Sequence, residues 1–174
     1  MLEKIIETTE FLKAKGIVDP DAGIILGTGL GELTAKIDKR LEIDYKDIPN
    51  FPLSTVEGHA GKLIYGEFGR KKIVAMKGRF HYYEGYGHEH LALPIRVLKY
   101  LGIKCLFLSN AAGGVNPSFQ IGDIMVITDH INLLPNPLIG PNDDRIGPRF
   151  PDMGEAYDKY LINKALLIAE ENNI

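Results

Sequence analysis

Residues 22–37 read AGIILGTGLGELTAKI, and this stretch decides the fold class that we expect. Residues 22–27 form a short apolar run with glycine near both ends, which is typical of a buried strand. After Gly29 the apolar residues change their period, so a helix should begin soon after that glycine. A buried strand, a glycine turn and a helix in this order predict an α/β fold.

The turn itself, LGTGLG at 26–31, is a candidate anion site, because a glycine turn before a helix exposes backbone N–H groups. Thr28 adds a hydroxyl to it. The turn lacks the third glycine of the dinucleotide fingerprint, since Glu32 stands there, and it has no Gly-Lys-Ser/Thr of the Walker pattern. An ordinary tight turn between a strand and a helix therefore remains an alternative.

Apolar and alternating runs on either side of this turn predict the remaining elements. The expected strands are 41–45, 61–68, 71–78, 103–110 and 123–130, and the expected helices are 2–12, 90–102 and a last one from residue 157 to the chain end. Residues 132–151 form a long loop rich in Pro, Gly and Asn, and its prolines favour an ordered, functional loop. Together these elements predict one α/β domain over residues 1–174.

Composition excludes several classes of function. The 174 residues are 45 % apolar and 25 % charged, as in ordinary globular domains. The net charge of -3 gives no overall basic field, so we expect neither a nucleic-acid partner nor a membrane partner. Cys105 is the one cysteine and cannot form an intrachain disulfide, which favours a reducing, cytoplasmic location. We expect no signal peptide, because the first residues carry acids and no continuous apolar stretch.

The segment GRFHYYEGY, residues 78–86, gathers cations and aromatic rings after a predicted strand. If residues 71–78 form that strand, Arg79 and His81 lie at its carboxyl end and alternate to the same side. Ligands of open α/β sheets bind at such ends, and a guanidinium beside a histidine suits an oxyanion. The alternative is a solvated turn in which Arg79 pairs with Glu84.

Two further loops carry candidate groups. His59 lies in STVEGHAGKL without apolar neighbours, and a plain surface histidine is the alternative to a binding role. The loop SNAAGGVNP follows the strand at 103–110, and its small residues would let a ligand approach the backbone. A plain turn would also use them. His88 and His90 have the spacing of a metal pair, but two histidines alone rarely make a site, so we expect no metal.

Six motifs occur in one order along the chain, and together they resemble the trimeric, low-molecular-mass class of purine nucleoside phosphorylases. The motifs are ILGTGLG, FPLSTVEGHAGKL, GRFHYYEGY, NAAGGVNP, GDIMVITDHIN and the run NPLIGPND, RFPDM and AYD. They cover the chain from Gly23 to Tyr157. The resemblance implies a three-layer α/β domain with a central mixed sheet flanked by helices, and it implies that the family continues beyond residue 174, so that this domain is C-terminally incomplete.

The resemblance also implies roles for individual residues. Phosphate would be held by Thr28, His59, Arg79, His81 and the backbone of Ala111, with His81 and Arg79 as the catalytic pair. The substrate would be contacted by Tyr83 at the ribose, by Ala112 and Gly113 beside the base, and by Phe150, which would reach the ribose pocket of a neighbouring subunit. A homotrimer with active sites at its interfaces follows from the last role. Inorganic phosphate is the co-substrate, and no cofactor is expected.

The implied reaction is phosphorolysis of purine (2′-deoxy)ribonucleosides to the free base and (2-deoxy)ribose 1-phosphate. Thr28 departs from the serine that the family usually has, although it keeps the hydroxyl. The groups that recognise and protonate the purine would lie beyond residue 174, so we expect the 174-residue chain alone to be a poor catalyst and its base preference to be undecided. Two alternatives stay open: a methylthioadenosine phosphorylase-type enzyme, and a non-catalytic module that binds phosphate or a sugar phosphate.

Overall fold

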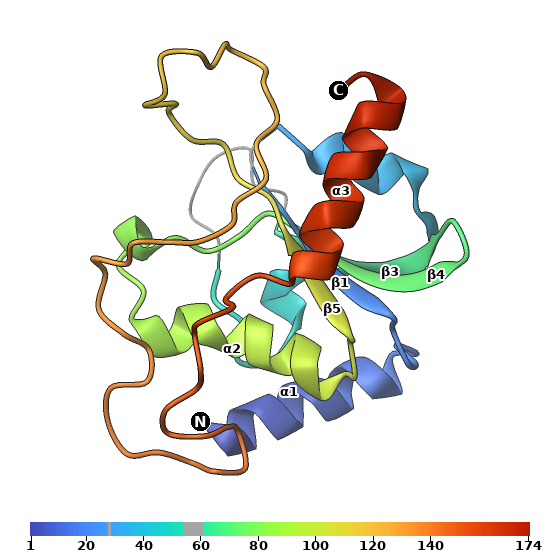
Figure 1. Ribbon diagram of the computed structural model, residues 1–174. Helices are drawn as coiled ribbons and strands as arrows, with labels where there is room; N and C mark the ends of the chain where they lie inside the picture. Colours follow the sequence, from blue (N-terminus) through green and yellow to red (C-terminus); the bar gives the residue numbers. More distant parts are fainter. Residues whose placement is uncertain (28, 54–60) are drawn as a thin grey trace. The chain divides into compact units, whose positions relative to one another are not determined.

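The computed structural model describes residues 1–27, 29–53 and 61–174. These residues form two compact units, Met1–Ala111 (the first unit) and Ala112–Ile174 (the second unit). Figure 1 shows the elements of each unit along the chain. The sheet and the candidate residues Arg79, His81 and Tyr83 belong to the first unit, and the long loop and the last helix belong to the second.

The first unit is built on a five-stranded mixed sheet with the strand order β2-β3-β4-β1-β5. Its strands are β1 (Ala22–Leu26), β2 (Asp38–Asp44), β3 (Lys62–Phe68), β4 (Lys71–Lys77) and β5 (Cys105–Leu108). Strand β1 runs parallel to both β4 and β5, whereas β2, β3 and β4 are antiparallel neighbours. The carboxyl ends of β1, β4 and β5 therefore meet at one edge of the sheet.

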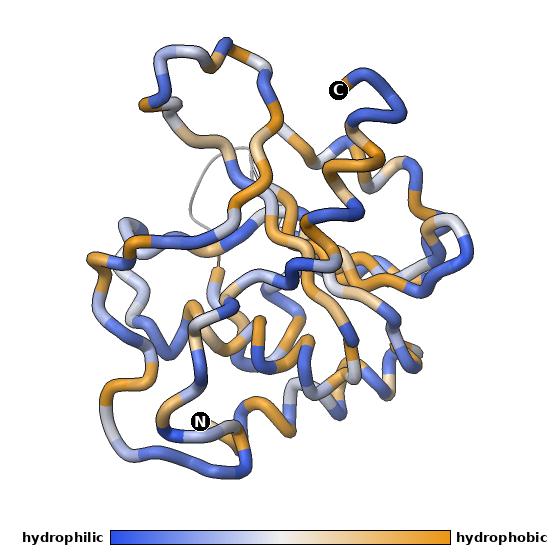
Figure 2. Tube along the Cα trace, in the orientation of Figure 1, coloured by the Kyte–Doolittle hydropathy of each residue, from blue (hydrophilic) through white to orange (hydrophobic). Residues whose placement is uncertain are grey.

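The apolar runs of the sequence explain the sheet. Strands β3 and β4 pair from Phe68 and Lys71 outward, and Gly69, at φ +62°, makes the tight turn between them. Their central residues are buried, as continuous apolar runs in a covered sheet should be. Figure 2 shows these strands and β1 as hydrophobic stretches of the trace.

Two helices cover the sheet of the first unit and contact each other, α1 (Leu2–Ala14) and α2 (His88–Tyr100) (Figure 1). Helix α2 comes close to β1 at Gly23, where an added Cβ would lie 3.3 Å from the Leu98 side chain. Helix α2 begins two residues earlier than the sequence pattern suggested, so Pro94 lies inside the helix instead of in its first turn. The cost is one missing backbone donor.

The helix expected after Gly29 is a short 3₁₀ helix, η1 (Gly31–Lys36). The chain enters β2 at Asp38, so there is room for only a few helical residues, and short segments commonly adopt the tighter 3₁₀ form. The Thr34 hydroxyl donates to the Gly31 carbonyl at 2.7 Å within it. Two further 3₁₀ turns are present, η2 (Tyr45–Asp47) directly after β2 and η3 (Tyr82–Glu84) between β4 and α2.

The second unit consists of loops followed by α3 (Lys159–Asn172). Asp158 caps this helix by accepting from the Leu161 N–H at 2.9 Å. The expected strand at 123–130 is wrong, because these residues pair with no strand among those that the structure describes. An apolar run becomes a strand only where a neighbour accepts its backbone hydrogen bonds. No helix in the described ranges is both long and apolar enough to span a bilayer.

Candidate functional site

Three strand ends are tied together at the carboxyl edge of the sheet. Gly27, which follows β1, donates its N–H to the Ser109 hydroxyl at 3.0 Å, and Ser109 follows β5. The Ser109 N–H donates in turn to the Ile25 carbonyl at 3.1 Å. Arg79, after β4, donates from Nη2 to the Ser109 carbonyl. The sequence thus placed Arg79 correctly at a strand end, and Ser109 is the group that joins the three ends.

Glycine is required at position 27 because the backbone of Ser109 and Asn110 lies too close to leave room for a side chain. A Cβ at this position would lie 2.5 Å from the Ser109 carbonyl oxygen and 2.9 Å from the Asn110 Cα. Both are backbone atoms, which cannot move aside as the end of a long side chain can. A glycine after a buried strand is thus explained here by packing between strand ends.

Arg79 is half-buried beside this junction. Burial lowers the pKa of its guanidinium, and interaction with Tyr83 opposes that shift. Within the described part of the chain, no carboxylate forms an ion pair with Arg79, and its hydrogen-bond partner is the neutral Ser109 carbonyl. The predicted alternative of an Arg79–Glu84 pair is therefore wrong. A half-buried cation with a neutral partner suits an anionic ligand.

Glu84 instead binds His81. Its Oε1 lies 2.9 Å from the His81 Nδ1 and also accepts from the His81 N–H at 2.8 Å. The Glu84 side chain is only 2 % exposed, so this contact is held firmly. With Nδ1 bonded to the carboxylate, Nε2 faces the opposite side of the imidazole. Sequence reasoning missed this role, although the i,i+3 spacing of histidine and glutamate before Gly85 is the signal that could have found it.

Tyr83 stacks on the His81 ring, with centroids 4.6 Å apart and an interplanar angle of 16°. Its side chain is 73 % exposed, so one face of the phenol lies on the imidazole and the other is open. Arg79, His81 and Tyr83 thus lie on one short segment after β4, and the binding roles expected of them stay predictions.

The other predicted site residues lie in the first unit, in the second unit, or outside the residues that the structure describes. Ala111 ends the first unit, and its carbonyl accepts from the Asn110 side chain at 3.4 Å. Ala112, Gly113 and Phe150 belong to the second unit, and all three are exposed. The Arg149 guanidinium lies over the Phe150 ring, 5.8 Å from its centroid. Thr28 and His59 lie outside the described residues.

His88 and His90 are engaged with aromatic rings. His88 stacks on Tyr82 at 5.0 Å between centroids, and His90 lies 6.1 Å from Tyr86. Among the described residues, no group of three or more His, Cys, Asp or Glu side chains is arranged to hold a metal ion.

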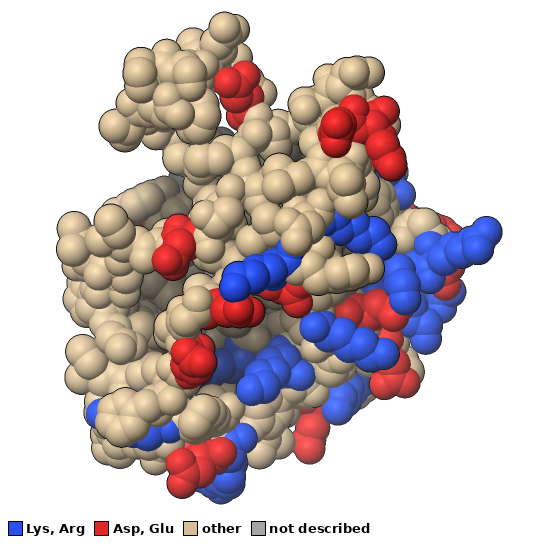
Figure 3. Space-filling view, in the orientation of Figure 1, with Lys and Arg blue, Asp and Glu red and all other residues tan. Residues whose placement is uncertain are grey.

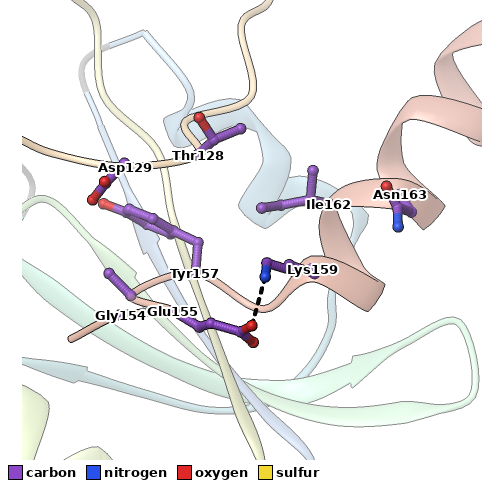
Figure 4. Close-up of a pocket in the computed structure, with 9 residues that line it drawn as sticks. Thr128, Asp129, Gly154, Glu155, Tyr157, Lys159, Ile162 and Asn163 are labelled. Atoms are coloured by element: carbon purple, nitrogen blue, oxygen red, sulfur yellow. Dashed lines mark hydrogen bonds and ion pairs between the residues drawn. The ribbon is translucent and has the colours of Figure 1, made fainter. Parts of the chain in front are cut away.

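Two pockets lie away from the strand-end site. The pocket of the second unit, about 260 Å³, is lined by Asp129, Tyr157 and Ile162 among others, and Lys159 at its wall pairs with Glu155 (Figure 4). The groove of the first unit, about 510 Å³, contains Lys62 between the Glu42 and Asp44 carboxylates. Opposite charges are likewise interspersed over the β3–β4 hairpin (Figure 3). Neither pocket contains a predicted site residue.

The chain belongs to the phosphorylase superfamily, whose family model matches residues 21–174. Among its relatives, purine nucleoside phosphorylase 1 of Geobacillus stearothermophilus is 54 % identical over 96 % of this chain and 61 % of the relative. Purine nucleoside phosphorylase 1 of Bacillus subtilis (strain 168) is 50 % identical over 100 % of this chain and 65 % of the relative. The chain thus spans less than two thirds of the length of these two relatives.

Solved structures give the same result. Isoform 2 of purine nucleoside phosphorylase from Schistosoma mansoni, in complex with cytosine and ribose-1-phosphate, is 49 % identical with a TM-score of 0.92. The match covers 98 % of this chain and 61 % of that chain. The resemblance to purine nucleoside phosphorylases and the predicted fold class, a mixed sheet with helices of the nucleoside phosphorylase type, are confirmed.

Proposed function

We propose that this protein is a purine nucleoside phosphorylase, which uses inorganic phosphate to split purine (2′-deoxy)ribonucleosides into the free base and (2-deoxy)ribose 1-phosphate. The observation that carries the proposal is the grouping of Arg79, His81 and Tyr83 at the carboxyl end of β4. Relatives named as purine nucleoside phosphorylases at 45–54 % identity support it. A structural neighbour whose complex contains ribose-1-phosphate supports the phosphate chemistry.

The proposed chemistry follows from charge placement. A phosphate oxygen attacks the anomeric carbon as the bond to the purine breaks, and the purine leaves with the electron pair and gains a proton. The ribose passes through an oxocarbenium-like state. Arg79 supplies a fixed positive charge to the phosphate. His81 contacts the phosphate through its imidazole, whose Nδ1 is held by Glu84. The reaction thus depends on positioning the phosphate and needs no metal or organic cofactor.

The remaining roles extend this proposal. Thr28, His59 and the Ala111 N–H complete the phosphate site, Tyr83 contacts the ribose, and Ala112 and Gly113 lie beside the base. Phe150 completes the site of a neighbouring subunit in a cytoplasmic homotrimer that serves nucleoside salvage.

The test is phosphate-dependent release of hypoxanthine from inosine by the protein expressed from its complete gene. The proposal predicts turnover that requires inorganic phosphate and yields ribose 1-phosphate. Preferential cleavage of 5′-methylthioadenosine would instead favour the methylthioadenosine phosphorylase alternative. Phosphate binding without cleavage of any nucleoside would favour the non-catalytic module.

A further inference from the structure

An aromatic cluster underlies the segment that carries Arg79 and His81. The cluster comprises Tyr45, Phe51, Phe80 and Tyr86. Phe80 lies between Arg79 and His81 in sequence, and its ring centroid is 5.1 Å from that of Tyr45 and 6.3 Å from that of Tyr86. Because neighbouring side chains of an extended segment alternate, a Phe80 ring fixed in the cluster directs its two neighbours away from it.

Two tyrosine hydroxyls of the cluster hold the two ends of this segment, one by binding its first backbone carbonyl and the other by tying its last residue to Leu53. The Tyr45 hydroxyl donates to the Gly78 carbonyl at 2.8 Å, directly before Arg79. Gly78 has φ +103°, so the chain changes direction there as it leaves β4. At the other end, the Tyr86 hydroxyl accepts from the Leu53 N–H at 3.1 Å and donates to the Leu53 carbonyl.

The Tyr45 hydroxyl keeps the proton that it donates to Gly78. Tyr45 is 2 % exposed, and burial raises the pKa of its phenol, so the proton stays in place at neutral pH. Loss of this hydroxyl would leave the Gly78 carbonyl without that donor at the point where the direction of the segment is set. Loss of the Tyr86 hydroxyl would release the segment from Leu53.

We propose that Tyr45 and Tyr86 are positioning residues for phosphate binding, which act by holding the backbone of residues 78–86 so that Arg79 and His81 converge on one anion. They act through the backbone and through Phe80, with no contact to phosphate required. This inference rests on the proposed function, because it assumes that Arg79 and His81 bind phosphate. A fixed geometry matters because small displacements of binding groups weaken the interactions of an anion site strongly.

The experiment uses the protein expressed from its complete gene and compares three tyrosine-to-phenylalanine variants that each remove one hydroxyl and keep the ring. Tyr65→Phe is the matched control, because Tyr65 is 3 % exposed and its hydroxyl donates to the Val18 carbonyl at 2.7 Å, away from residues 78–86. The probe is inorganic phosphate, measured by calorimetric titration and by KM in inosine cleavage, with KM for inosine and the melting temperature as further readouts.

Tyr45→Phe and Tyr86→Phe should each raise the phosphate Kd and the phosphate KM by about 3- to 10-fold, the effect of one ordinary hydrogen bond. The KM for inosine should change less than twofold in both. Tyr45→Phe and Tyr65→Phe should lower the melting temperature similarly, while Tyr65→Phe leaves phosphate binding unchanged. If Tyr45→Phe fails to fold, Tyr86→Phe carries the test, since its Leu53 partner is exposed.

The Arg79→Ala variant distinguishes failure of the positioning role from failure of the proposed function. If wild type binds phosphate, Arg79→Ala does not, and both tyrosine variants bind as wild type does, the positioning role is overturned and the proposed function stands. If wild type and Arg79→Ala bind phosphate equally, both are overturned.

Discussion

Arg79 holds a positive charge in a half-buried place where its hydrogen-bond partner is a neutral carbonyl. Burial disfavours that charge, as the lowered pKa of the guanidinium indicates. A charged group that is not compensated within the described residues destabilises the folded state. Binding of an anion to that group would stabilise the folded state again. Among the residues that the structure describes, this uncompensated charge is the strongest sign of an oxyanion site.

Glu84 binds one nitrogen of the His81 ring, Nδ1, and so fixes how the imidazole is oriented. Glu84→Gln keeps the size of the side chain but replaces a charge-assisted contact by a neutral one. We expect a rise of about 3- to 10-fold in the phosphate Kd, with the KM for inosine nearly unchanged. Phosphate titration and steady-state kinetics measure both.

The matched control is Glu89→Gln, because the Glu89 side chain is 71 % exposed and lies 3.9 Å from the His90 ring. It should behave as wild type. An equal effect of the two variants would contradict the role of Glu84.

The junction of β1, β4 and β5 is the element on which the site depends. Gly27→Ala places a Cβ against the backbone of Ser109 and Asn110, so the strand ends must separate. We expect a loss of about 1–3 kcal/mol in the free energy of unfolding, as for other overpacking substitutions. Urea denaturation measures it.

Gly147→Ala is the control, because its Cβ would meet nothing within 4 Å. A Gly27→Ala variant as stable as Gly147→Ala would show that the strand ends are packed less closely than we describe.

At the opposite end of β1, Asp21 makes the stability of the protein depend on pH. At the start of that strand, Asp21 accepts from the Lys72 N–H at 3.0 Å and from the Lys71 ammonium at 3.2 Å. The Lys72 hydrogen bond first, and then that of Lys71, lowers the pKa of the Asp21 carboxyl. A carboxyl whose pKa falls on folding stabilises the protein above its unfolded pKa of about 4, and this contribution is lost as the pH falls through the lower folded value.

Asp21→Asn should therefore reduce the melting temperature at pH 7 and weaken its decline between pH 7 and pH 3. Thermal unfolding at several pH values gives both quantities. An identical decline in the variant and in wild type would contradict the contribution of Asp21.

The exposed apolar surface governs behaviour at the scale of the whole molecule. Strand β5 stands at the end of the strand order, and its residues Phe107 and Leu108 are 48 % and 59 % exposed. In the second unit, Ile131 and Leu133 are each 91 % exposed, and Figure 2 shows further hydrophobic stretches along its loops. Edge strands and apolar surface of this kind favour association.

We expect the 174-residue chain to associate with rising concentration and to bind a hydrophobic dye. Light scattering coupled to size-exclusion chromatography measures the first, and dye fluorescence the second. A monodisperse monomer that binds no dye would contradict this prediction.

The sequence predicts the sheet of the first unit well because three of its strands, β1, β3 and β4, are apolar runs followed directly by glycine, such as the run before Gly27. It fails where the outcome depends on a partner. Residues 123–130 have the composition of a strand but no described neighbour to pair with, and the segment after Gly29 forms a 3₁₀ helix because β2 begins at Asp38. The site is predicted in part. The position of Arg79 and His81 after a strand can be derived from the sequence, because apolar runs mark where strands end. Whether Glu84 pairs with Arg79 or with His81 depends on local backbone geometry, which the sequence pattern does not give.

The most direct test of the central claim is a calorimetric titration of Arg79→Ala with inorganic phosphate, with Arg70→Ala as the control. Arg70 is an exposed arginine in the turn between β3 and β4, so its loss changes the net charge equally. Removing a hydrogen bond to a charged group costs about 1.5–3 kcal/mol, so Arg79→Ala should raise the phosphate Kd at least about tenfold while Arg70→Ala leaves it unchanged. Equal phosphate affinities in wild type, Arg70→Ala and Arg79→Ala would contradict the account.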